Sequence, residues 1–119
     1  MKTDPEQSKI SISNDETEVV VDGLDDQLAP NLLAYPKIER IRTNGNNTNL
    51  TDSGVRQLSK LKELQELDLE WSTKLTDEGL LALSKAKKLK YLDISFCEGI
   101  TDSGIEKLKS SIPKCEIER

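Results

Sequence analysis

The sequence lacks histidine, has few aromatic residues and contains no long apolar run. The absence of histidine removes the usual general base, the serine–histidine and cysteine–histidine couples, and the commonest zinc ligand. The longest apolar runs span four residues, as at 80–83, so neither a transmembrane helix nor the apolar segment of a signal peptide is predicted. We therefore expect a protein that is not an enzyme, binds no metal or cofactor, and does not enter a membrane.

Aromatic residues and positive net charge are also scarce. Only four of the 119 residues are aromatic, so a core built around ring clusters is excluded. The formal net charge is −5 and the isoelectric point is near 4.8. Because phosphate backbones repel an acidic protein, we expect no nucleic-acid partner.

Cysteine is limited to Cys97 and Cys115, which lie far apart in the sequence. A small disulfide-held domain carries more cysteines at closer spacing, and two thiols without histidine cannot complete a four-ligand zinc site. Two buried free thiols in a reducing compartment are the favoured interpretation, with a single disulfide or a redox role as alternatives. Together with the missing signal segment, this predicts a cytoplasmic protein.

A short motif recurs three times with a period of 25 residues. It has the sequence LTDSGV at 50–55, LTDEGL at 75–80 and ITDSGI at 100–105. Apolar residues follow at matching offsets in each unit, as at 64, 67 and 69 and again at 89, 92 and 94. Chance does not produce this pattern, so we expect a repeat architecture.

Each unit changes its apolar spacing halfway. Apolar residues three apart at 55, 58 and 61 predict one face of a short helix, and Leu67-Asp68-Leu69 then alternates as a short strand does. The Thr-Asp pair can accept hydrogen bonds at the start of the helix, and lysines follow near its end, where positive charge is favoured. We expect the glycine of the motif to let consecutive turns pack closely.

The motif followed by L-x-x-L-x-[LI] resembles leucine-rich repeats of the cysteine-containing type, found in receptor subunits of ubiquitin ligases and in bacterial repeat proteins. Cys97 stands at the position that gives this type its name, with Ser72 at the equivalent place one unit earlier. The resemblance implies an α/β fold, a right-handed solenoid of about four repeats. Its curved parallel sheet carries the helices on the convex side.

The chain divides into segments on this basis. Two short strands around Asn14-Asp15 form either a hairpin-like cap or a degenerate terminal repeat, and Pro113 indicates a closing edge strand. We expect a nearly complete small protein. The segments are a disordered leader at 1–8, cap strands at 9–23, a divergent first repeat at 24–49, repeats at 50–74 and 75–99, and a shortened last repeat at 100–119.

The outward-facing residues of the strands form the candidate binding surface, because repeat proteins commonly bind partners on the concave face. One predicted row runs Arg42, Asp68, Asp93 and Glu116 across the strands. Such an acidic strip suits a basic segment of a protein partner; the alternative is a solvated face that keeps the protein soluble. The other outward-facing candidates are Arg40, Glu66, Glu70 and Tyr91.

Trp71 and Phe96 follow their strands at equivalent positions, so stacked units should place them side by side at one rim of the sheet. Exposed aromatics beside carboxylates are typical of binding hot spots. The alternative is that the two rings pack on each other and cover the end of the leucine ladder.

The resemblance implies a monomeric, non-enzymatic module for protein–protein interaction. A subunit of a larger assembly is the alternative, because the layout is similar to that of the leucine-rich coupling factor of mitochondrial ATP synthase. Asp68 and Asp93 would lie on an open surface, where nothing raises one pKa for acid–base catalysis.

Overall fold

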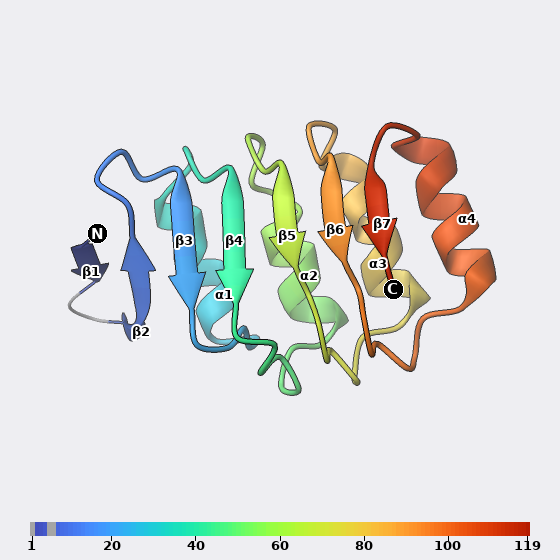
Figure 1. Cartoon of the computed structure of the whole chain (residues 1–119), viewed down its shortest axis with the longest axis horizontal. Helices are drawn as coiled ribbons and strands as arrows, with labels where there is room; N and C mark the ends of the chain where they lie inside the picture. The colour runs from blue at the N-terminus through green and yellow to red at the C-terminus, as the bar shows by residue number, and fades with distance from the viewer. Residues whose placement is uncertain (1, 5–6) are drawn as a thin grey trace.

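The computed structural model describes residues 2–4 and 7–119 (Figure 1). Seven strands form one sheet in which spatial order follows chain order. The strands are β1 (Lys2–Asp4), β2 (Gln7–Ile12), β3 (Glu18–Val21), β4 (Arg40–Thr43), β5 (Glu66–Asp68), β6 (Tyr91–Asp93) and β7 (Glu116–Glu118). The helices are α1 (Leu28–Asn31), α2 (Asp52–Leu58), α3 (Asp77–Ala82) and α4 (Asp102–Ser111), with 3-10 turns η1 (Leu32–Ala34) and η2 (Leu83–Lys85).

The sheet is parallel from β3 to β7. A helix connects each pair of neighbouring parallel strands; in Figure 1, α1, α2 and α3 lie behind the sheet and α4 lies beside β7 at the C-terminal end. One face of the sheet is thus covered and the other, which we call the open face, carries no helix. The predicted α/β class is confirmed, and one helix and one strand fall within each of the four segments from residue 24 onward.

Threonine begins each of the three later helices. Thr51, Thr76 and Thr101 are the N-cap residues of α2, α3 and α4, and each side chain accepts a hydrogen bond from a backbone N–H of the first turn. An aspartate follows each threonine and lies in the first helical turn, where the helix dipole favours negative charge. The Thr-Asp pair therefore starts the helices as the sequence predicts.

The aspartates also join consecutive units, which the sequence did not predict. Asp52 accepts hydrogen bonds from the Thr76 N–H at 2.8 Å and from the Thr76 hydroxyl at 2.5 Å. At Gly79, an added Cβ would lie only 2.3 Å from Asp52 Oδ1 and 2.9 Å from its Cα. The glycine of the motif is needed because the preceding aspartate comes so close.

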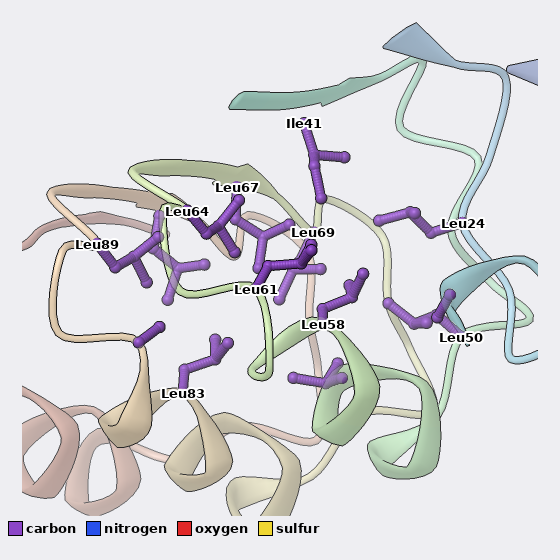
Figure 2. Packing of buried hydrophobic residues seen from close by; sticks show 14 of the residues in the cluster. Leu24, Ile41, Leu50, Leu58, Leu61, Leu64, Leu67, Leu69, Leu83 and Leu89 are labelled. Carbon is purple, nitrogen blue, oxygen red and sulfur yellow. The ribbon is translucent and has the colours of Figure 1, made fainter. Parts of the chain in front are cut away.

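The core is a continuous layer of aliphatic side chains between the sheet and the helices. Leu67 and Leu69 point from β5 and its end toward Leu58 of α2 and Leu83 of η2, and all four are fully or almost fully buried (Figure 2). Each fully buried leucine contributes about 2 kcal/mol of transfer free energy. Leucine ladders thus supply the burial for which the sequence has too few aromatics.

The N-terminal end differs from the sequence prediction. In place of a disordered leader at 1–8, β1 pairs antiparallel with β2, as in Lys2 opposite Ile12, and β2 begins at Gln7. Backbone hydrogen bonds along the edge of β2 favour this added strand. Residues 1, 5 and 6 of the predicted leader lie outside the described residues.

The cap strands form an antiparallel hairpin of β2 and β3, while β3 is also parallel to β4. β3 thereby occupies the place of a repeat strand, so the structure combines the two alternatives. Ile10 and Ile12 are buried against the first unit. In the described part of the chain, no helix has the length and apolar character needed to cross a bilayer.

Candidate functional site

The open face carries two rows of side chains that cross the parallel strands. In the first row, Glu66 lies between Arg40 and Tyr91, and Tyr91 in turn is opposite Glu116. The second row contains Asp68, Asp93 and Glu118 as direct neighbours. Parallel strands are about 4.8 Å apart, so three carboxylates stand in consecutive order along the second row.

The last member of the acidic row was wrongly assigned by the sequence. Glu118, and not Glu116, lies opposite Asp93. The backbone sets this register, because the Glu116 N–H donates to Lys90 O at 2.9 Å and the Ile94 N–H donates to Glu118 O at 2.7 Å. This register continues the 25-residue period, which runs from Asp68 through Asp93 to Glu118; the expectation of a shortened last repeat had moved the assignment to Glu116.

Arg40 and Arg42 occupy the N-terminal part of the open face and both contact Glu18. Arg40 Nε lies 3.3 Å from one Glu18 carboxylate oxygen, and Arg42 Nε lies 3.5 Å from the other. Arg40 also contacts Glu39 at 3.4 Å. The sequence analysis missed Glu18, although its place on β3 opposite Arg40 would have indicated the contact once the register was known.

Asp68, Glu70 and Asp93 form a cluster in which one carboxylate oxygen of each lies within 4.8 Å of the others. The pKa of Glu70 is raised, first by burial and then by the charges of Asp68 and Asp93. Asp68 is held by the Glu70 N–H at 3.0 Å, and Asp93 by the Ser95 N–H at 2.9 Å. The cluster concentrates negative potential where β5 and β6 end, and it attracts a positive charge.

Tyr91 connects the two rows. Its hydroxyl donates a hydrogen bond to Glu118, and this bond, followed by burial and the nearby carboxylates, raises the tyrosine pKa well above its ordinary value. The phenol therefore stays neutral and holds Glu118 on the open face. A shallow hollow of about 250 Å³ lies beside it, lined by Ile41, Arg42, Glu66, Leu67, Asp68, Tyr91 and Asp93.

Trp71 and Phe96 are stacked side by side just beyond the acidic cluster, as the repeat predicts. Their ring centroids are 4.3 Å apart and the ring planes differ by 12°. The two rings therefore pack on each other, while Trp71 remains 44% exposed and Phe96 58% exposed. Both backbones are left-handed, with φ of 63° and 62°, and Gly45 has φ of 80° after the preceding strand.

Two adjoining segments, 61–84 and 85–109, each match the family model described as Leucine Rich repeat. The chain is a leucine-rich repeat protein. Domains of this family generally mediate protein–protein interaction and are typically not enzymes. No curated protein sequence matches this leucine-rich repeat protein.

The repeats also explain a ladder of three small residues that follow the strands, namely Asn47, Ser72 and Cys97. Asn47 accepts a hydrogen bond from the Leu24 N–H at 2.8 Å and donates to Glu70 O at 2.8 Å, thus joining three turns of the leucine-rich repeat protein. Cys97 donates its thiol hydrogen to a buried carbonyl, Leu69 O, at 3.1 Å. Both side chains are buried and serve the fold.

Both thiols of this leucine-rich repeat protein are free and buried, as expected. Burial raises the pKa of Cys97 to about 11 and also raises that of Cys115. The thiolate is the reactive form, so these cysteines are inert in the folded chain at neutral pH.

Proposed function

We propose that the chain is a protein-binding module that recognises its partner through the open face of the sheet and the Trp71–Phe96 pair. The row of Asp68, Asp93 and Glu118 carries this proposal. In the described part of the chain, no lysine or arginine forms an ion pair with any of these three carboxylates or with Glu70. Adjacent like charges destabilise a sheet, and a basic segment of a partner would relieve that repulsion.

The architecture proposed for this surface is a right-handed solenoid of about four repeats. Crossover connections between parallel strands are almost always right-handed, which supports the handedness. The open face is then the concave side and the helices form the convex side. A monomer with this shape presents the acidic row and the aromatic pair to one partner at the same time.

Arg40, Arg42 and Glu66 complete the proposed surface at its N-terminal part. Because Glu18 and Glu39 already pair with the arginines, their role would be to hydrogen-bond a polar part of the partner and to set its position. Arg42 is well placed for this, since its side chain remains 63% exposed. The buried free thiols support a reducing compartment, and we propose the cytoplasm.

The test is capture of binding proteins from a cell extract with immobilised wild-type chain and the double variant Asp68→Lys/Asp93→Lys. The matched control is Glu78→Lys/Glu106→Lys, which changes net charge equally on exposed residues of the helices α3 and α4, away from the strands. We expect the same protein to be captured by wild type and control and lost with the open-face variant. Equal capture by all three would refute the proposal.

A single replacement, Trp71→Ala, separates the two parts of the surface. Capture that fails with Trp71→Ala but survives the double charge reversal would move the site from the open face to the aromatic pair. A structural subunit of a larger assembly is the alternative function. That function predicts a captured protein that is lost with the control variant as well, because a permanent subunit would contact the helices too.

A further inference from the structure

Trp71 and Phe96 occupy backbone positions that favour glycine. Both have φ near +60°, where a residue with a Cβ is less stable by roughly 1–2 kcal/mol, and Gly45 fills the corresponding place after β4. Trp71 is 44% exposed and Phe96 58% exposed, so a large part of each side chain stays in solvent despite this conformation. The backbone conformation alone therefore favours glycine at 71 and 96, and the solvent-exposed part of the aromatic pair is available to a partner.

The stacked pair leaves ring surface available. The planes are nearly parallel at 12°, so Trp71 covers one face of Phe96. Phe96 nevertheless remains 58% exposed. Ring surface of the aromatic pair is thus available to a flat group.

The carboxylate cluster lies close to the rings. A Cβ placed on Gly45 would be 3.3 Å from Trp71 Cδ1 and 3.8 Å from Glu70 Oε2, so ring and carboxylate border the same small volume. Glu70 in turn shares its cluster with Asp68 and Asp93. Burial and these two charges raise the pKa of Glu70, and a cation placed beside it would remove the repulsion.

We propose that the aromatic pair and the adjacent carboxylates receive an arginine side chain from an extended segment of the protein partner. A guanidinium is planar, stacks on aromatic faces and donates hydrogen bonds to carboxylates from its edge. An ammonium group keeps its hydration more strongly and cannot stack as a plane. This inference rests on the proposed function and specifies the chemistry of the partner.

The test uses Trp71, which is the only tryptophan, as a fluorescent reporter. The probe is a capped glycine heptapeptide that contains two arginines separated by one glycine, and the matched peptides carry lysine or citrulline instead. We expect saturable change of tryptophan emission with the arginine peptide and weakening at high salt. The citrulline peptide keeps the planar shape without the charge, and we expect it to bind at least about tenfold more weakly.

Three variants locate the bound group. Phe96→Gly removes the outer ring and relieves the backbone, and we expect about fivefold weaker arginine binding. Glu70→Gln/Asp93→Asn should weaken binding and reduce its salt dependence. Glu106→Gln removes one negative charge on exposed α4 and should leave binding unchanged. Circular dichroism melting confirms that each variant is folded before the titration.

The outcomes separate this inference from the proposed function. Equal affinity of the arginine and citrulline peptides, unchanged binding by Phe96→Gly, or no peptide binding at all would overturn the arginine assignment. A captured partner that is still lost with Asp68→Lys/Asp93→Lys would keep the proposed function in each of those cases. Peptide binding, combined with capture that is the same for wild type and Asp68→Lys/Asp93→Lys, would refute the proposed function and retain the arginine site.

Discussion

Asp77 accepts two hydrogen bonds from Thr101, one from the backbone N–H at 2.9 Å and one from the hydroxyl at 2.6 Å. These bonds lower the pKa of Asp77, which is therefore ionised when folded. Because Thr101 begins α4 and Asp77 belongs to α3, one carboxylate joins two consecutive repeats. The same arrangement links Asp52 to Thr76 and Asp26 to Thr51.

The first prediction concerns this link. Asp77→Asn should lower the free energy of unfolding by about 1 kcal/mol, a value reduced for solvent screening because the carboxylate is partly exposed. In the wild type the folded pKa lies below the unfolded value of 3.8, so this stabilisation is complete above that value and is lost as the pH falls through the folded pKa. Urea unfolding measures this loss. The decrease in the free energy of unfolding from pH 6 to pH 3 should be smaller for Asp77→Asn than for the wild type.

The matched control is Asp102→Asn, at the equivalent position of the last repeat. Asp102 contacts Arg119 and not a threonine of a following unit, and its side chain is 82% exposed. Its replacement should change the free energy of unfolding by less than about 0.5 kcal/mol. If both variants lose equal stability, the threonine link contributes nothing specific.

The second prediction tests the left-handed backbone at Phe96. Phe96→Gly should unfold with a free energy about 1 kcal/mol higher than Phe96→Ala, because glycine adopts positive φ without strain. In an ordinary extended or helical position the order would be reversed. Denaturant unfolding of the two variants decides the matter, and a more stable alanine variant would contradict the structure.

The third prediction compares two buried positions of the small-residue ladder. Asn47→Ala leaves the Leu24 N–H and Glu70 O without partners and should lower the free energy of unfolding by about 3 kcal/mol. The Ser72 hydroxyl has no hydrogen-bond partner within the described residues. Ser72→Ala should therefore change the free energy of unfolding by less than about 1 kcal/mol. Equal losses in thermal or denaturant unfolding would show that the asparagine bonds are not what stabilises the turns.

The fourth prediction concerns the thiols. Burial raises the pKa of Cys97 to about 11 and protects both cysteines, so a thiol reagent at pH 8 should label neither in the native chain and both in denaturant. The raised pKa means that Cys97 contributes stability below its unfolded value of 9.0, and this stability is lost as the pH rises toward 11. Cys97→Ala should therefore show a shallower loss of stability over that range, and rapid native labelling would contradict the burial.

Much of the fold follows from the sequence because the repeat is local. The spacing of Val55 and Leu58 and the alternation at Leu67 and Leu69 select helix and strand within each unit, and stacking buries both. Equivalent positions then come together, which is why the stacking of Trp71 on Phe96 was predictable. The N-terminal leader was not, because pairing along an edge strand depends on backbone bonds and leaves little pattern in side chains.

The site was only partly predictable, because it depends on register. Asp68 and Asp93 share the strict period of 25 residues and fall opposite each other. Glu118 continues the same period and was missed because a shortened last repeat was expected, while Glu18 reaches Arg40 from a strand outside the regular repeat. Sequence spacing cannot supply the register of β3, because that strand precedes the regular repeat.

The sequence by itself determined the repeat, the leucine core and the place of the acidic and aromatic residues within each unit, since these depend on periods of two, three and 25 residues. Only the tertiary structure decided which charges are paired and which are free. It placed Glu18 on both arginines, left Asp68 and Asp93 without a cation among residues 2–4 and 7–119, and set Trp71 in a left-handed turn. These features arise from distances between strands, and electrostatic and backbone energies depend on those distances and not on sequence separation.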